Sequence, residues 1–193
     1  MPKIDNEQFY TSAIKKFGVT PKGVNWASKK NQQLRFKQLL KLLPPDINSF
    51  SLADAGCGFG DFYFYLEKKK SLPKEYIGLD IHQDMCSIAR QNSGQEILEI
   101  DIIKGTLPVC DYYVCSGALN VLTTFETHLF IQNCFKSSKK GFIFNALYGE
   151  KESETYNYLT KEKIQEIAQT LGVKELVLEE GYMENDITVG FFR

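Results

Sequence analysis

The stretch Asp54-Ala55-Gly56-Cys57-Gly58-Phe59-Gly60-Asp61 has the residue types and the spacing of a ligand-binding loop. Alternating glycines allow a sharp turn with positive φ, and they let a ligand approach closer than a Cβ atom would permit. The loop follows an apolar run, which predicts a strand, and precedes an amphipathic run, which predicts a helix. It therefore predicts a small-molecule site at a strand-to-helix turn.

The same loop disfavours two phosphate-binding motifs. A dinucleotide fingerprint, Gly-x-Gly-x-x-Gly, needs glycine where the chain has Asp61. That carboxylate would lie at the helix N-terminus where a pyrophosphate binds, and the negative charges would repel each other. A P-loop is disfavoured because no Gly-Lys-Ser/Thr follows. The loop favours a ligand with an adenosine and a cationic amino-acid tail but no phosphate.

Two more carboxylates follow the next two predicted strands. Asp80 ends a strand over 76–80, and Asp101 follows a strand over 96–100. Asp80 can accept two hydrogen bonds from vicinal hydroxyls. Two alternatives stay open, since aspartate favours helix caps and turns: Asp80 could cap the following helix, and Asp101 could be a surface turn residue.

The elements that position these residues alternate between strands and helices. Apolar runs predict strands over 50–55, 76–80, 96–100, 110–115, 142–146, 174–179 and 186–192. Helical periodicity separates most of them, so we expect an α/β fold with a parallel, doubly wound sheet and helices on both faces. The last two strands have no helix between them, and this hairpin adds one antiparallel strand.

Two amphipathic helices precede the first strand and predict an N-terminal helical cap over residues 1–45. Gly18 and Pro21 end the first helix, and Pro44 ends the second. Since Gly18, Pro21 and Gly23 suit a hinge, we expect this cap to act as a lid over the core at 50–193. The 193 residues are predicted to form a single domain.

Composition limits the partners of the chain. Its 23 Lys and Arg and 24 Asp and Glu give a formal charge of −1, so there is no global positive field for a nucleic acid. No run is apolar enough to cross a membrane and no signal peptide begins the sequence, which predicts a cytoplasmic protein. The five cysteines have no metal-site spacing, and we expect them to be reduced and mostly buried.

The chain resembles the class I S-adenosylmethionine-dependent methyltransferases over 50–193. Their first motif, an acidic residue followed by Gly-x-Gly-x-Gly, matches Asp54 to Gly60 in full. The acids Asp80 and Asp101 and the terminal hairpin follow in the family's order. The resemblance implies a Rossmann-like methyltransferase fold, a seven-stranded and mostly parallel sheet whose last strand is antiparallel, with S-adenosylmethionine as cofactor.

The resemblance also implies roles for the strand-end residues that would hold adenosine. Asp80 would hold the ribose, and Asp101 would accept the adenine amino group. Ile102 would offer a backbone N–H to a ring nitrogen, and Ile81 an apolar face to the base.

The methionine portion of the cofactor would lie against the glycine loop and the end of the fourth strand, at Gly56, Cys57, Gly58, Gly60, Ser116 and Gly117. The carbonyls of Ser116 and Gly117 would receive the ammonium group. Asp54 would orient the loop or accept a bond from the amino-acid end. We interpret Cys57 as a small side chain rather than a nucleophile, because no base neighbours it in sequence.

Trp26 and Arg35 lie in the predicted cap, in a segment similar to the start of small bacterial members of the family. Arg35 could bind the methionine carboxylate with two hydrogen bonds, and Trp26 could close over the sulfonium by cation–π attraction. A solvated helix face for Arg35 and a core anchor for Trp26 remain the alternatives.

We expect methyl transfer to a small-molecule acceptor. Asn120, Asn145 and Tyr148 are candidates for holding it, and no catalytic residue is assigned because alignment alone can suffice. The Asn/Asp-Pro-Pro-Tyr element that marks methylation of base or glutamine amino groups is absent after the fourth strand. Two alternatives stay open: a noncatalytic module that binds the cofactor or its demethylated product, and another transferase on the same cofactor fold.

Overall fold

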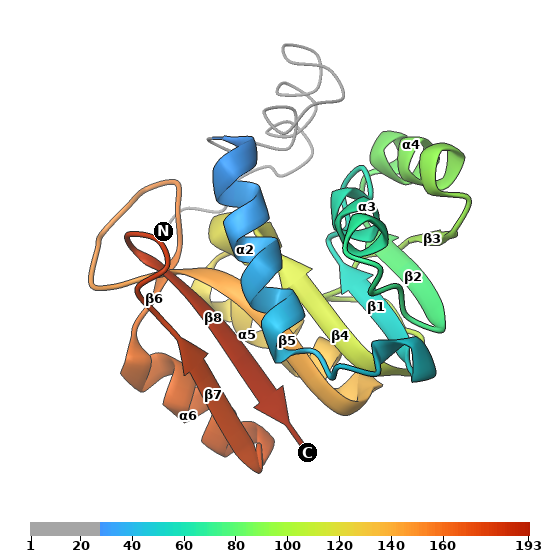
Figure 1. The fold of residues 1–193 in the computed structure, drawn as a ribbon. Helices are drawn as coiled ribbons and strands as arrows, with labels where there is room; N and C mark the ends of the chain where they lie inside the picture. Colours follow the sequence, from blue (N-terminus) through green and yellow to red (C-terminus); the bar gives the residue numbers. More distant parts are fainter. Residues whose placement is uncertain (1–27) are drawn as a thin grey trace.

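The computed structural model describes residues 28–193, which form a three-layer α/β fold around one mixed sheet (Figure 1). The strand order is β3-β2-β1-β4-β5-β8-β7, and a short β6 pairs with β5. The strands are β1 (Ser51–Ala55), β2 (Glu75–Asp80), β3 (Glu96–Glu99), β4 (Cys110–Ser116), β5 (Ser138–Tyr148), β6 (Tyr158–Leu159), β7 (Glu175–Glu179) and β8 (Asp186–Phe192). Strand β8 runs antiparallel to both of its neighbours, and the other pairings are parallel. The predicted doubly wound sheet with a closing hairpin is confirmed.

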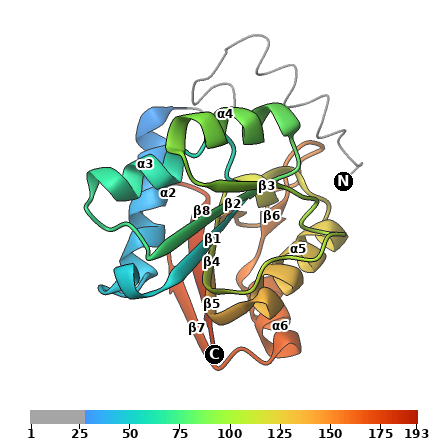
Figure 2. The same ribbon diagram turned by 90° about the vertical axis from the view of Figure 1, so that its right-hand side faces the viewer.

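Helices cover both faces of this sheet (Figure 2). One face carries α2 (Lys29–Leu42), α3 (Asp61–Lys68) and α4 (Gln83–Ser93), and the other carries α5 (Thr124–Ser137) and α6 (Lys161–Leu171). Two short 3₁₀ helices, η2 (Ile47–Ser49) and η3 (Ala118–Val121), complete the elements. A separate apolar core therefore forms on each side of the sheet.

Local sequence signals set the helix ends. Thr123 and Glu126 form the predicted capping box at the start of α5, which satisfies backbone N–H groups that the helix leaves unpaired. The Thr160 side chain accepts a hydrogen bond from the Lys163 N–H, and Gly172 ends α6 with a φ of +68°. These ends agree with the sequence because each depends on residues within one helical turn.

Helix α2, the described part of the predicted N-terminal cap, packs on the core. Ser28 caps α2, which buries Phe36 and Leu39 against α3 and the sheet. The rings of Phe36 and Phe62 lie 5.1 Å apart. Burying such a side chain stabilises a fold by roughly 1.5–3 kcal/mol, so these contacts favour the packed position of α2. The predicted hinge and Trp26 lie outside the described residues.

Two differences from the sequence-based prediction concern the length of β5 and the strand that pairs with its end. This strand runs from Ser138 to Tyr148, well beyond the predicted 142–146, and the two-residue β6 pairs with its last two residues. A two-residue strand has no periodicity of its own, so only pairing reveals it.

The remaining structural expectations concern cysteines, membranes and metals. All five cysteines are free, and all are buried, as predicted. Among residues 28–193, no helix has the length and apolar character needed to cross a membrane. The same residues contain no group of three or more His, Cys, Asp and Glu side chains that could hold a metal ion.

Candidate functional site

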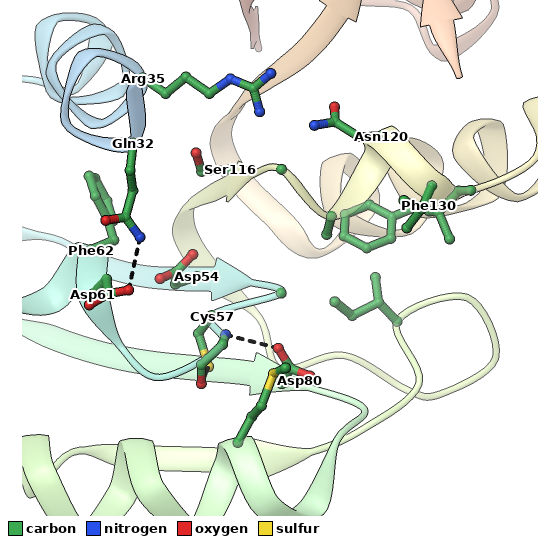
Figure 3. A pocket seen from close by; sticks show the side chains of 18 of the residues that line it. Gln32, Arg35, Asp54, Cys57, Asp61, Phe62, Asp80, Ser116, Asn120 and Phe130 are labelled. Carbon is green, nitrogen blue, oxygen red and sulfur yellow. Dashed lines mark hydrogen bonds between the residues drawn. The ribbon is translucent and has the colours of Figure 1, made fainter. Parts of the chain in front are cut away.

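A cavity of about 520 Å³ opens at the carboxyl ends of β1, β2 and β4 (Figure 3). It lies where the strand order reverses, with β1 between β2 and β4, which is the usual ligand position in open α/β sheets. Its volume is within the range of small-molecule sites. Of the predicted site residues, those lining it are Arg35, Asp54, Gly56, Cys57, Gly58, Asp80, Ile81, Asp101, Ile102, Ser116 and Gly117.

The glycine loop forms the floor of the cavity. The Gly56 and Cys57 N–H groups both donate to the Leu79 carbonyl, at 2.7 and 3.0 Å, which ties the loop to β2. Gly56 has a φ of +79°, and a Cβ there would stand 2.6 Å from the Cβ of Ala118. Glycine is therefore required by both conformation and space. Gly60 does not line the cavity; with a φ of +82° it forms the cap that starts α3.

Asp80 connects the glycine loop to the end of β2. Its Oδ2 accepts a hydrogen bond from the Gly58 N–H at 2.9 Å, and its Oδ1 accepts one from the His82 N–H at 3.0 Å. Burial raises the pKa of Asp80, while these two bonds act in the opposite direction. The N-cap position of α4 is taken by His82, so the alternative of Asp80 as that cap is not what the structure has. Each carboxylate oxygen keeps acceptor capacity towards the cavity.

Asp101 has both a turn contact and a cavity position. Its Oδ1 accepts a hydrogen bond from the Ile103 N–H at 2.9 Å, which is the aspartate turn that the alternative interpretation expected. Its Oδ2 lies 3.5 Å from Lys104 Nζ, an exposed ion pair of little energetic weight. The carbonyl of Ile102 accepts a hydrogen bond from the Asn133 side chain at 2.9 Å, which fixes this loop beside the cavity.

Asp54 is a buried carboxyl group at the end of β1. The Tyr76 hydroxyl donates to its Oδ2 at 2.6 Å. Burial, and to a smaller extent the charges of Asp80 and Asp61, raise the pKa of Asp54 from 3.8 to about 7, although the Tyr76 bond lowers it. A cation entering the cavity would favour the ionised form of this group.

Cys57 is a packed thiol in the loop. Burial, followed by the charges of Asp80 and Asp54, raises its pKa well above the ordinary value. A Cβ on Gly78 would lie only 2.9 Å from its sulfur, so the side chain fills space beside β2. A nucleophilic cysteine needs a lowered pKa, and the structure thus supports a packing role.

Arg35 reaches the cavity, but its guanidinium has a protein partner that the sequence does not predict. Nε donates to Asp186 Oδ2 at 2.7 Å, and Nη2 binds the same oxygen. Both side chains are buried. This pairing replaces the solvated face that was one alternative, and it uses much of the donor fork expected to bind a carboxylate. Nothing local could have indicated it, because the two residues lie 151 positions apart.

A second α2 side chain was also missed. Gln32 is buried, lines the cavity, and donates from Nε2 to Asp61 Oδ2 at 2.8 Å (Figure 3). Gln32 lies one helical turn after the N-cap Ser28 and on the buried face of α2. Helical periodicity was therefore the only signal in the sequence that could have predicted its burial. Together with Arg35, Gln32 makes α2 one wall of the site.

The three acceptor candidates are separated by the structure. Asn120 lines the cavity. Asn145 is fully buried behind Ser116, and Tyr148 turns away, its hydroxyl 3.5 Å from Glu180. The expected contact with the cavity is wrong for both: Asn145 is bonded between Ser116 and Thr188 within the sheet, and Tyr148 belongs to β5, which continues past the predicted end at 146. The lining that sequence reasoning missed on this side comprises Val121, Leu147, Tyr156, Tyr158, Met183, Glu184 and Asp186.

Comparison with known proteins gives the same fold and a methyltransferase-domain match over part of the chain. Residues 52–141 match the family model described as "Methyltransferase domain". Magnesium protoporphyrin IX methyltransferase from Synechocystis, solved with S-adenosylhomocysteine, is 14% identical, with a TM-score of 0.69 over 85% of this chain and 83% of that one. A Mesorhizobium loti S-adenosylmethionine-dependent methyltransferase is 15% identical, with a TM-score of 0.63 over 81% and 96%.

Human N-acetylserotonin methyltransferase, solved with S-adenosylmethionine, is 12% identical, with a TM-score of 0.66 over 96% of this chain and 55% of that one. No curated protein matches the sequence.

The fold, with its glycine loop at the reversal of strand order, is that of the Rossmann-like transferases that bind an adenosyl cofactor. Residues 52–141 match a methyltransferase domain, and the fold is shared with methyltransferases solved with S-adenosylmethionine or S-adenosylhomocysteine.

Proposed function

We propose that the enzyme methylates a small molecule bound over the ends of β5, β6 and β8. The observation that carries this proposal is one continuous cavity with two different parts. The glycine loop and the strand-end acids line the first, which we name the cofactor part. Mostly apolar and aromatic residues line the second, the acceptor part, namely Asn120, Val121, Leu147, Tyr156, Tyr158 and Met183.

The residues of the cofactor part fit an S-adenosylmethionine molecule. We assign Asp80 to the ribose hydroxyls, Asp101 and Ile102 to the adenine edge, and Ile81 to its face. The glycine loop lets the backbone approach the methionine portion closely, as its positive φ angles and missing Cβ atoms allow. When bound, the cofactor supplies a methyl group already activated by the sulfonium.

Charge in the cavity also suits this cofactor. The ionisable acids that line it are Asp54, Asp61, Asp80, Asp101, Glu184 and Asp186, whereas Arg35 is the one Lys or Arg side chain among the lining residues described. An excess of carboxylates in a partly enclosed site attracts cations, such as a sulfonium and an ammonium. It repels a dinucleotide pyrophosphate, in keeping with the position of Asp61.

The chain's part in the reaction is alignment and exclusion of water. Phe36 and Phe62 from α2 and α3 and Leu147 from β5 line the cavity and keep its walls apolar. The acceptor part then holds the nucleophile beside the methyl group, which removes most of the entropic cost of meeting. A dedicated base is not required for an acceptor whose reacting atom is already unprotonated, such as a carboxylate oxygen, since no proton then has to leave.

A small acceptor agrees with the size of the cavity and the charge of the chain. Two structural neighbours are named for small molecules, magnesium protoporphyrin IX and N-acetylserotonin. A formal net charge of −1 offers no general attraction to a nucleic acid.

The test has two stages. Calorimetric titration with S-adenosylmethionine and S-adenosylhomocysteine should show micromolar binding, with no appreciable binding of NAD. A panel of small amines, phenols and carboxylic acids is then incubated with labelled S-adenosylmethionine, and the methylated product is identified by mass. Tighter binding of NAD would refute the cofactor assignment, and methylation of RNA or protein but of no small molecule would refute the acceptor class.

A further inference from the structure

A row of hydrogen-bonded side chains crosses the sheet behind the cavity. Ser116, Asn145 and Thr188 stand side by side on β4, β5 and β8, because Ser116 pairs with Asn145 and Asn145 with Thr188 in the strand register. The Ser116 hydroxyl bonds Asn145 Oδ1 at 2.8 Å, and Asn145 Nδ2 bonds the Thr188 hydroxyl at 2.6 Å. Thr188 bonds the Tyr182 hydroxyl at 2.9 Å, and Tyr182 bonds Asp186 Oδ1. We name these five residues the polar row.

The far end of the polar row fixes the direction of every bond in it. Burial raises the pKa of Asp186, but Arg35, which is always charged and is itself buried, acts in the opposite direction and donates twice to Asp186 Oδ2, a geometry that favours the ionised carboxylate. An ionised carboxylate can only accept, so Tyr182 must donate to it. A hydroxyl has one hydrogen, so Tyr182 must accept from Thr188, and Thr188 must in turn accept from Asn145.

Asn145 extends this fixed order of donors and acceptors to Ser116, which lines the cavity. Its NH₂ group is committed to Thr188, so its carbonyl oxygen faces Ser116. Ser116 must therefore donate its one hydrogen to Asn145. Only lone pairs remain on the Ser116 oxygen, and Ser116 lines the cavity at the end of β4, near Asp54 (Figure 3).

Asp54 lies on the same face of the sheet as Ser116. It pairs in register with Val114 of β4, two residues before Ser116, and alternate residues of a strand share a face. A buried carboxyl group and a hydroxyl that can only accept thus lie close together at the ends of adjacent strands. A ligand group between them has to donate hydrogen bonds and would best be cationic.

We propose that the Ser116 hydroxyl is a hydrogen-bond acceptor for the ammonium group of the cofactor's methionine tail, and that the polar row, ending at Asp186 and Arg35, holds it in that orientation. This inference rests on the proposed function. Ser116 touches the ligand, whereas Asn145, Thr188, Tyr182 and Asp186 are positioning residues. The orientation discriminates in favour of an ammonium and against a carboxylate at this point, because a carboxylate would need the hydrogen that Ser116 gives to Asn145.

The experiment interrupts the polar row at Thr188, away from the cavity. Thr188→Val removes the hydroxyl with little change of shape, which leaves the Asn145 amide free to turn and Ser116 free to rotate. S-adenosylhomocysteine, which carries the ammonium, should bind about 3- to 10-fold more weakly, the range for one ordinary hydrogen bond, because the Ser116 hydroxyl is reoriented rather than removed. Its deamino analogue, which keeps the carboxylate and lacks the ammonium, should bind unchanged or more tightly. Thr188→Ser restores the hydroxyl and should restore the affinity.

The matched control is Thr127→Val. Thr127 is also buried and also accepts a side-chain amide bond, from Asn157 at 2.9 Å, but it is outside the polar row and does not line the cavity. It should leave the affinities for both probes unchanged. If Thr188→Val does not fold, Tyr182→Phe interrupts the row at a partly exposed site, with the same expected pattern.

The outcomes separate this inference from the function on which it rests. If the wild-type chain binds neither S-adenosylhomocysteine nor 5′-methylthioadenosine, the proposed cofactor site is wrong and the inference is wrong with it. If wild-type binding is normal but the folded row variants keep full affinity, or lose affinity equally for the two probes, only the role of the polar row is refuted.

Discussion

The cofactor part and the acceptor part of the cavity are built in different ways. Residues directly after consecutive strands form the cofactor part, and backbone hydrogen bonds hold it, such as those from Gly56 and Cys57 to Leu79. The acceptor part combines side chains from η3, from the end of β5 and the loop after it, from β6 and from the β7–β8 hairpin. The difference indicates that the first is determined by strand order, and the second by long-range packing.

Helix α2 belongs to both parts. Gln32 bonds Asp61 beside the glycine loop, and Arg35 bonds Asp186 beside the acceptor part. The two bonds are one helical turn apart, so a single rigid helix spans the cavity. If the two parts of the cavity are built independently, a change at the Gln32–Asp61 contact should affect cofactor binding, and a change at the Arg35–Asp186 contact should affect the packing of the acceptor part.

The largest expected effect comes from breaking the contact on the acceptor side. Arg35→Met leaves Asp186 buried without its cationic partner, and removing one member of a buried ion pair typically costs about 3–5 kcal/mol. Chemical unfolding should show a lowered midpoint. Combining Arg35→Met with Asp186→Leu should recover much of the loss, and a double variant no more stable than the single one would contradict the pairing.

The next effect concerns pH and sharpens the description of the cofactor part. The pKa of Asp54 is raised to about 7 in the folded chain, so the fold binds this proton more tightly than the unfolded chain does. Its contribution to stability is complete below about pH 4, is lost as pH rises towards 7, and then stays constant. The loss should be on the order of a few kcal/mol.

Asp54→Asn isolates this contribution, because asparagine does not titrate. Thermal unfolding measured from pH 4 to 8 should show a smaller decline for this variant than for the wild type. Parallel curves would mean that Asp54 does not titrate in that window. Tyr76→Phe removes a bond that lowers the pKa of Asp54, so its decline should extend to higher pH.

Asp80→Ala tests the cofactor part directly. It removes the proposed ribose contacts and the acceptor for the Gly58 N–H, so S-adenosylmethionine binding should weaken by roughly 1–3 kcal/mol. Asp111→Ala is the matched control, since Asp111 accepts from the Ser51 N–H and hydroxyl at 3.0 Å and does not line the cavity. Calorimetry should show near-normal affinity for that variant. Unchanged affinity with lowered stability in Asp80→Ala would make Asp80 purely structural.

The smallest effect on stability is expected at the rim of the acceptor part. Tyr156 is 40% exposed, so Tyr156→Ala should change stability and cofactor affinity by about 0.5 kcal/mol or less. Its effect should appear instead as a raised KM for the acceptor found in the screen. A variant that lost cofactor affinity while its acceptor KM stayed normal would contradict the division of the cavity.

The sequence predicted most of the residues that line the glycine-loop end of the cavity, because its signals are local. Glycine spacing sets the loop, an acid after a short apolar run marks a strand end, and the Thr123–Glu126 capping box lies within one helical turn. The two predictions for Asp101 were a turn residue and a residue of the cavity, and the structure has both, because both depend on its place directly after a strand.

What the tertiary structure alone decided depends on which strands become neighbours. The sequence predicted an antiparallel closing hairpin, but not that β8 would lie between β5 and β7 and bring Arg35, Asn145 and Asp186 together. Helical and strand periodicity report which face a residue is on, but they do not report what stands opposite. A buried polar side chain needs a hydrogen-bond partner, and here the partners are far apart in the sequence. The polar row, the α2 contacts and the acceptor part are therefore visible only in the folded chain.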